Sequence, residues 1–229
     1  MPMAGFLAHE WIANLVFQKL KRKNFITQSG NLDDYFFGAI APDIRYIANS
    51  PRDITHKPFG NESLFEALKS SSTSAAFVAG YEVHLITDIA WSNDKKWLDE
   101  SIYEHYKINP NQNVPKFTLY GLVDDYFQAE ADTSFPLECS ERVMRAKDTK
   151  ILLRLSFTNT QILNYKYFLS IYFREPGVDT IINFDFFPDN TDEILIRKFL
   201  EDKTGITDYL REFKKVAVEK SVAALEKYL

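Results

Sequence analysis

Cysteine, basic charge and long apolar runs are all scarce in this chain, and each shortage excludes something. The only cysteine is Cys139, so no intramolecular disulfide can form, and a single free thiol suits a reducing compartment such as the cytoplasm. No stretch approaches the ~20 apolar residues that a membrane-spanning helix needs. The apolar N-terminus lacks a preceding basic segment and is interrupted by His9 and Glu10, which argues against a secretory signal. We therefore expect a cytoplasmic protein without a transmembrane segment.

Basic residues are outnumbered by acidic ones. The chain has 27 lysines and arginines against 32 aspartates and glutamates, which gives a net charge of −5 at pH 7. A domain that binds long nucleic acid neutralises many phosphates and normally shows a basic patch. We expect no long nucleic acid as a partner, and compact or neutral substrates stay open.

The spacing of apolar residues predicts an all-α protein, a multi-helix bundle. Hydrophobic residues make up 45% of the 229 residues, which is enough to bury a full core. Helical spacing recurs in segments 4–20, 34–41, 63–69, 74–91, 95–106, 117–131, 138–174 and 192–229, the last one broken near Gly205. The second of these helices would be capped by Asn31 or Asp33 and ended by Pro42. Segment 178–188 is compatible with a strand or an extended loop.

Histidine is rare as well, with four in the chain, yet three of them lie close to aspartates in the first ninety residues. These residues are His9, Asp43, His56, His84 and Asp88. Imidazole nitrogens and carboxylate oxygens together suit zinc or a similar divalent ion. His84 and Asp88 are four residues apart on one helix face, so both can reach the same ion. The sequence therefore predicts a metal site.

Each of these residues also has a purely structural interpretation. A single histidine on an apolar helix face is more often a hydrogen-bonded core residue than a ligand, and Asp43 follows a proline, where turn and capping residues are common. His56 lies in a segment with two prolines and a glycine, so we expect it on a loop. The face that carries His84 and Asp88 also carries Gly80, which indicates close approach of another backbone or of a bound group.

Four segments carry a more specific pattern. They are GFLAHEWIANLV (5–16), YFFGAIAPDIRY (35–46), DITHKPF (53–59) and FVAGYEVHLITDIAW (77–91). In order and spacing they resemble the zinc-dependent phospholipase C family, which is related to the fungal single-strand nucleases. The resemblance covers roughly residues 4–92. Members of that family are all-helical and hold up to three zinc ions, which activate water to cleave a phosphate ester.

The resemblance implies a role for each residue of the predicted site. Asp43, His56, His84 and Asp88 would bind one zinc ion, and His9 would help to bind a second, with Asp88 bridging the two because its two oxygens can serve two ions. Apart from the resemblance, the chemistry of a metal site makes Asp43 the candidate catalytic residue, because it could orient or deprotonate the attacking water, a role that geometry must decide.

A third metal site is expected to be degraded or absent. The family uses two histidines and a glutamate after the helical aspartate, and this chain offers only Asp94 and His105 as replacements. In secreted members a processed N-terminal residue also binds metal, a role that we do not expect for Met1. Of the adjacent Asp124 and Asp125, at most one can face the site, because neighbours on a helix point to different sides.

These features together predict a single domain, 1–229, with the metal site in residues 1–135 and a helical C-terminal part in 136–229. The expected function is that of a zinc-dependent hydrolase that cleaves phosphoester bonds in a small phosphoester or a phospholipid. The alternative is a non-catalytic, metal-stabilised helical scaffold that binds a partner. The helices around 164–173 and 208–229 could form a homodimer interface, or their apolar faces could pack within the chain.

Overall fold

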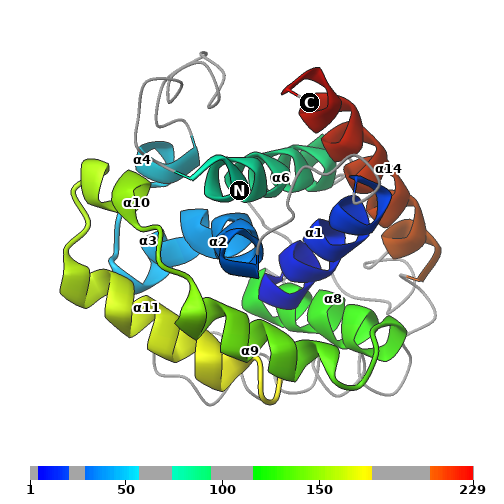
Figure 1. Cartoon of the computed structure of the whole chain (residues 1–229). Coiled ribbons are helices and arrows are strands. Elements are labelled where there is room, and N and C mark those ends of the chain that lie inside the picture. Colours follow the sequence, from blue (N-terminus) through cyan, green and yellow to red (C-terminus); the bar gives the residue numbers. More distant parts are fainter. Residues whose placement is uncertain (1–4, 21–28, 57–73, 94–115, 177–206, 229) are drawn as a thin grey trace.

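The computed structural model describes residues 5–20, 29–56, 74–93, 116–176 and 207–228 (Figure 1). In chain order the helices are α1 (Phe6–Leu20), α2 (Ser29–Ile40), the 3₁₀ turn η2 (Ala41–Asp43), α3 (Ile44–Ile47), α4 (Arg52–His56), α6 (Ala75–Asn93), α8 (Lys116–Glu130), α9 (Phe135–Arg145), α10 (Lys150–Arg154), α11 (Asn159–Tyr172), α14 (Thr207–Leu225) and the 3₁₀ turn η4 (Glu226–Tyr228). These residues contain no strand, which confirms the predicted all-α class. The helices expected over 63–69 and 95–106, the start of the one expected from residue 192, and segment 178–188 lie outside the described residues.

Helices α2 and α6 form the centre of the molecule and approach each other very closely. A Cβ atom built on Gly80 of α6 would lie 1.8 Å from the carbonyl oxygen of Tyr35 in α2. In the opposite direction, a Cβ atom on Gly38 of α2 would lie 2.2 Å from the carbonyl oxygen of Phe77 in α6. The close backbone approach predicted from Gly80 is therefore confirmed, and the group that approaches is another helix.

Two hydrophobic clusters flank this central pair. One joins α2 and α6 to α1, α8 and α14, through large side chains such as Trp91, Phe127 and Phe213. The other joins the opposite end of α1 and the same central pair to α9, α10 and α11, through Phe37, Phe77 and their neighbours. Figure 1 shows α9 and α11 along one side of the molecule and α14 on the other. Of the predicted site residues, His9, His84 and Asp88 lie on α1 and α6, which contribute to both clusters.

The start of α1 is held by a buried carboxylate from α8. Asp124 accepts hydrogen bonds from the backbone nitrogens of Leu7 (3.1 Å) and Ala8 (2.9 Å) and from the hydroxyl of Tyr172 (2.5 Å). The first N–H groups of a helix have no partner within the helix, so a carboxylate at this end satisfies them and interacts favourably with the helix dipole. This contact places the first turn of α1, and with it His9.

Three local predictions were wrong. The helix expected over 138–174 is interrupted, because the chain leaves helical geometry at Ala146 and again at Ser156, whose φ is 69°. A new helix then starts at the capping box formed by Thr158 and Gln161. The second helix begins at Ser29, so Asn31 and Asp33 lie inside it and do not cap it. His56 ends the short helix α4 and does not lie on a loop, since a single helical turn fits between Pro51 and Pro58.

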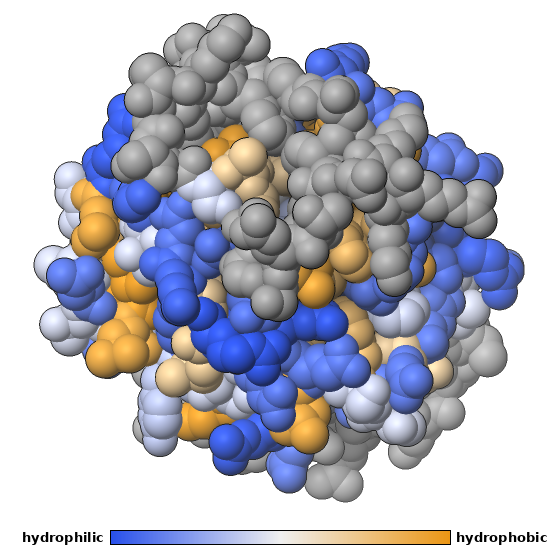
Figure 2. Space-filling view, viewed as in Figure 1, coloured by the Kyte–Doolittle hydropathy of each residue, from blue (hydrophilic) through white to orange (hydrophobic). Residues whose placement is uncertain are grey.

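The two C-terminal helices differ in how much apolar surface they leave exposed. The apolar face of α14 packs inside the molecule, where Tyr209, Leu210 and Phe213 belong to the first cluster. On α11, Leu163 and Tyr167 are 59% and 63% exposed. On the face shown in Figure 2, hydrophobic residues form separate patches between hydrophilic ones. For α14 the packing lies within the chain, and a homodimer through α11 stays a prediction. None of the described helices is both long enough and apolar enough to cross a membrane.

Candidate metal centre

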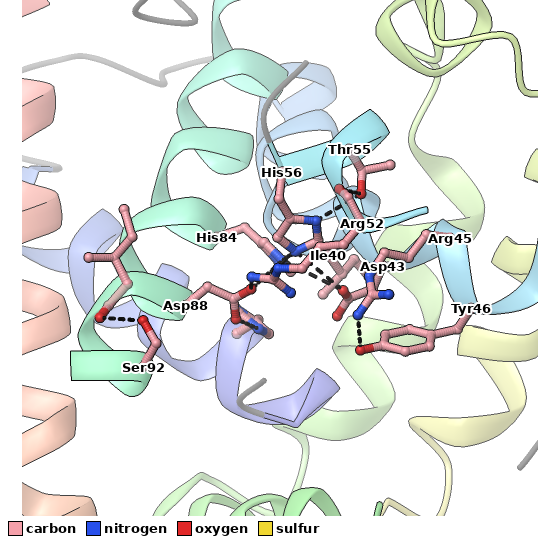
Figure 3. Close-up of polar contacts among 12 residues, drawn as sticks. Ile40, Asp43, Arg45, Tyr46, Arg52, Thr55, His56, His84, Asp88 and Ser92 are labelled. Carbon is pink, nitrogen blue, oxygen red and sulfur yellow. Dashed lines mark hydrogen bonds and ion pairs between the residues drawn. The ribbon is translucent and has the colours of Figure 1, made fainter. Parts of the chain in front are cut away.

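The five predicted ligands come together at one place, although they lie on four separate elements. His9 is on α1, Asp43 ends η2, His56 ends α4, and His84 with Asp88 is on α6. His9, Asp43 and His84 are fully buried, and the side chains of Asp88 and His56 are only 2% and 5% exposed. Figure 3 shows the side chains of Asp43, His56, His84 and Asp88 pointing toward one another.

Asp88 is the carboxylate around which the three histidines gather. His56 Nε2 lies 3.1 Å from Oδ2 of Asp88, and His84 Nε2 lies 3.9 Å from the same oxygen. His9 Nε2 instead lies 3.5 Å from Oδ1, without a hydrogen bond between the two atoms. The two oxygens of Asp88 therefore face different imidazoles, which is the arrangement expected of a carboxylate that serves two ions.

Asp43 is the second buried carboxylate of the group. Its Oδ1 lies 3.7 Å from His84 Nε2 and 4.0 Å from His56 Nε2. Neither of its oxygens has a hydrogen-bond partner among the described residues. Buried polar atoms are almost always satisfied, and a buried carboxylate with no partner is costly. A cation at this position would satisfy it.

Hydrogen bonds on the far side of two imidazoles orient their Nε2 atoms toward the centre. Nδ1 of His84 lies 2.8 Å from the carbonyl oxygen of Ala39, which can only accept, so Nδ1 carries the hydrogen and Nε2 carries the lone pair. Nδ1 of His56 lies 2.8 Å from Oγ1 of Thr55, whose hydroxyl donates to the carbonyl oxygen of Arg52. The hydroxyl oxygen can also accept from Nδ1 of His56, and in that tautomer the lone pair is on Nε2.

The result is a cluster of imidazole nitrogens and carboxylate oxygens at short distances from one another. The two Nε2 atoms of His56 and His84 are 3.3 Å apart, and carboxylate oxygens of Asp43 and Asp88 lie within about 4 Å of one or both. Such atoms repel one another unless a positive charge lies among them. Two sets of three ligand atoms are close enough to share an ion, His9 with Asp43 and His84, and His56 with His84 and Asp88. The donor set of nitrogens and oxygens fits zinc or a similar divalent cation.

Burial keeps both imidazoles in the form that binds metal. It lowers the pKa of His84 well below its ordinary value, and the nearby His9 adds to this effect. Burial also lowers the pKa of His56. For the two carboxylates the directions differ. Burial and the proximity of Asp88 raise the pKa of Asp43, whereas the facing imidazoles of His56 and His9 outweigh burial and lower the pKa of Asp88.

One residue that the sequence analysis did not single out also reaches the centre. The guanidinium of Arg52, at the start of α4, donates from its NH2 nitrogen to Oδ2 of Asp88, and Figure 3 shows it extended toward that carboxylate. Arg52 lies four residues before His56, a spacing that places both side chains on one helix face. The four-residue spacing of Arg52 and His56 is visible in the sequence, but it places the two side chains together only if the segment is helical.

The structure describes only some of the remaining candidates. Asp94 and His105 lie outside the described residues, as does Met1. Asp124 is buried but holds the start of α1, and it contacts none of the five predicted ligands. Glu10 is also fully buried next to His9, and burial raises its pKa well above its ordinary value.

Comparisons of the chain with protein-family models, with curated proteins and with solved structures found no match. The proposal of a function therefore depends on the geometry of the centre and on the resemblance described above.

Proposed function

We propose that the protein is a metal-dependent hydrolase that cleaves phosphoester bonds, with an activity like that of the zinc-dependent phospholipases C. The observation that carries the proposal is the convergence of the Nε2 atoms of His56 and His84 on two buried carboxylates. Three imidazoles and two carboxylates from four elements are more than a core needs for its own hydrogen bonds. The same five residues are those that the resemblance implies as ligands.

Asp43, His56, His84 and Asp88 would hold one cation. His9 would hold a second together with Oδ1 of Asp88, the oxygen that His56 and His84 do not face. A bound divalent ion acts as a Lewis acid, which makes water a stronger nucleophile at neutral pH and neutralises charge on a phosphoryl group. Uncatalysed hydrolysis of a phosphate monoester is among the slowest reactions known in water, so the site must supply a large rate enhancement.

The residues of the chain would then each have a defined task. The Ala39 carbonyl and the Thr55 hydroxyl keep His84 and His56 in the tautomer that binds metal. Asp43, which has no other hydrogen-bond partner among the described residues, is free to orient the attacking water or to take its proton.

The substrate would be a small phosphoester or the headgroup of a phospholipid. Access would be from the side of α4, because Arg52 is 24% exposed while Asp88, which it contacts, is 2% exposed. The acidic net charge of the chain disfavours long nucleic acid.

Metal analysis of the purified protein, joined to assays on a phosphomonoester, a phosphodiester and phosphatidylcholine, tests the proposal. The key variant is Asp88→Asn, which keeps the shape of the side chain and removes its charge. The matched control is Asp53→Asn, the same change at an exposed carboxylate on α4. We expect bound zinc and phosphodiester hydrolysis in the wild type and in Asp53→Asn, and a loss of both in Asp88→Asn.

Two outcomes would contradict parts of this proposal. A wild-type protein that binds no divalent metal would show that the centre is a buried polar cluster. Bound metal without hydrolysis of any phosphoester would favour the alternative of a metal-stabilised scaffold. The near-complete burial of the five ligands is the observation that supports this alternative.

A further inference from the structure

We propose that Arg52 is the residue that binds the phosphate of the substrate at the proposed metal centre. This inference deepens the proposed function and rests on it. It assigns an anionic phosphoester as the substrate class and gives a role to a side chain that is not a metal ligand.

The position of Arg52 is the first support. Its side chain is 24% exposed, yet its NH2 nitrogen reaches the buried Oδ2 of Asp88. The guanidinium thus spans the distance from the surface to the carboxylate around which the three histidines gather. Any substrate that approaches the centre from the side of α4 passes this group.

The second support is an unused donor. The NH1 nitrogen of Arg52 is buried and has no hydrogen-bond acceptor among the residues that the structure describes. A buried donor without an acceptor is unfavourable, more so when it belongs to a charged group. Arginine presents its donors as a rigid planar fork, and a phosphate can accept from two of them at once. With NH2 on Asp88, NH1 is left for an acceptor that is not a protein group.

The third support is a comparison with Arg45, the other arginine drawn beside the centre in Figure 3. The two arginines are engaged differently. The guanidinium of Arg45 stacks on the ring of Tyr46, 3.9 Å from its centroid, and donates to the hydroxyl of the same residue. Arg52 has no aromatic partner of this kind among the described residues, which makes it the better candidate for contact with a substrate.

A cation and the guanidinium of Arg52 could contact the carboxylate of Asp88 at the same time. Each carboxylate oxygen has two lone pairs, so Oδ2 can accept from Arg52 on one side while its other lone pair faces the imidazoles. In this arrangement Arg52 keeps its contact with Asp88 and stays beside the ion, where a phosphate that binds the ion also meets NH1. Arg52 would then contribute to phosphate binding and not to metal binding.

The test measures the binding of inorganic phosphate to the zinc-loaded protein by calorimetry, together with zinc content. The variants are Arg52→Met, which keeps much of the side-chain volume, and Arg52→Lys, which keeps the charge but not the planar fork. The control is Arg145→Met on α9, whose guanidinium pairs with Asp33 and Glu141. We expect Arg52→Met to retain its zinc and to bind phosphate about tenfold to a hundredfold more weakly. Arg52→Lys should recover part of the affinity, and Arg145→Met should match the wild type. In hydrolysis assays, Arg52→Met should raise KM for an anionic diester more than it lowers kcat.

Each possible result decides the inference. If zinc-loaded Arg52→Met binds phosphate as tightly as the wild type does, Arg52 only neutralises Asp88 and the inference is wrong, while the proposed function stands. If Arg52→Met loses its zinc, the arginine supports the metal centre and is not a phosphate ligand. If the wild type binds no phosphate in the presence of zinc, the inference is overturned, and the assays on Asp88→Asn decide separately whether the proposed function survives.

Discussion

Replacing Gly80 by alanine should push helices α2 and α6 apart and weaken the metal centre that they carry. The added Cβ would lie 1.8 Å from the carbonyl oxygen of Tyr35 and 2.9 Å from the backbone nitrogen of Ala39. Real Cβ atoms essentially never come closer than 3.0 Å to another heavy atom, so one backbone must move by more than about 1 Å relative to the other. Both contacts are with backbone, which cannot rotate away as a side chain can.

Two opposing effects set the magnitude. Alanine is favoured over glycine in a helix interior by about 1 kcal/mol. Overpacking in a tight core costs about 1–3 kcal/mol, and a clash with backbone belongs at or above the upper end of that range. We therefore expect the free energy of unfolding of Gly80→Ala to fall by about 2 kcal/mol. The shift also stretches the bond between Nδ1 of His84 and the carbonyl of Ala39, so zinc affinity should fall as well.

Urea unfolding of the metal-free protein, followed by circular dichroism, measures the first effect. The pair Ile89→Ala and Ile89→Gly is the control, because Ile89 is 54% exposed on the same helix and reports the intrinsic difference between the two residues. A Gly80→Ala protein as stable as the wild type, or more stable by the Ile89 difference, would refute the close packing of α2 on α6.

The other expectations concern the ligands and two buried carboxyl groups. His84→Ala should abolish the stabilisation of the fold by zinc. For the wild type this stabilisation reaches about 4 kcal/mol at a free zinc concentration a thousand times Kd. If thermal melts of the variant with and without zinc still differ, His84 is not a ligand. Burial raises the pKa of Asp124 to about 7, against 3.8 for an ordinary aspartate, so the native state holds a proton that the unfolded state has lost between these values. The stability of the metal-free wild type should therefore fall relative to Asp124→Asn as the pH rises from about 4 to 7, by at most about 1.4 kcal/mol per pH unit. If the urea midpoints of the two proteins change by the same amount between pH 5, 6 and 7, this expectation is wrong. Glu10→Gln should be at least as stable as the wild type at pH 7. Burial also raises the pKa of Glu10, and its oxygens have no hydrogen-bond partner among the described residues. A loss of more than about 1 kcal/mol in the free energy of unfolding would show that the carboxylate has a hydrogen-bond partner.

The periodic parts of the fold were predictable from the sequence. Helix α6 was expected over 74–91 and runs over Ala75–Asn93, and α8 was expected over 117–131 and runs over Lys116–Glu130. Apolar spacing is strong in these long segments. The short element α4 was missed, because a single turn between two prolines has too few residues to show a period. The breaks at Ala146 and Ser156 were missed for a related reason, although the Thr158 and Gln161 capping pair was visible.

The five ligand candidates were identified from residue type, order and spacing, since few side chains can bind a divalent ion and this chain has few histidines. Sequence alone could not say that the Nε2 atoms of His56 and His84 would both point into one cluster, because that depends on contacts of their Nδ1 atoms with Ala39 and Thr55, which have no distinctive chemistry of their own. It also could not reveal Arg52, whose contact with Asp88 joins α4 to α6. Residue chemistry is a property of the chain, whereas the direction of a lone pair or the partner of a guanidinium arises only when separate helices pack together. The close packing of α2 on α6, which Gly38 and Gly80 permit, is what brings Asp43 beside His84.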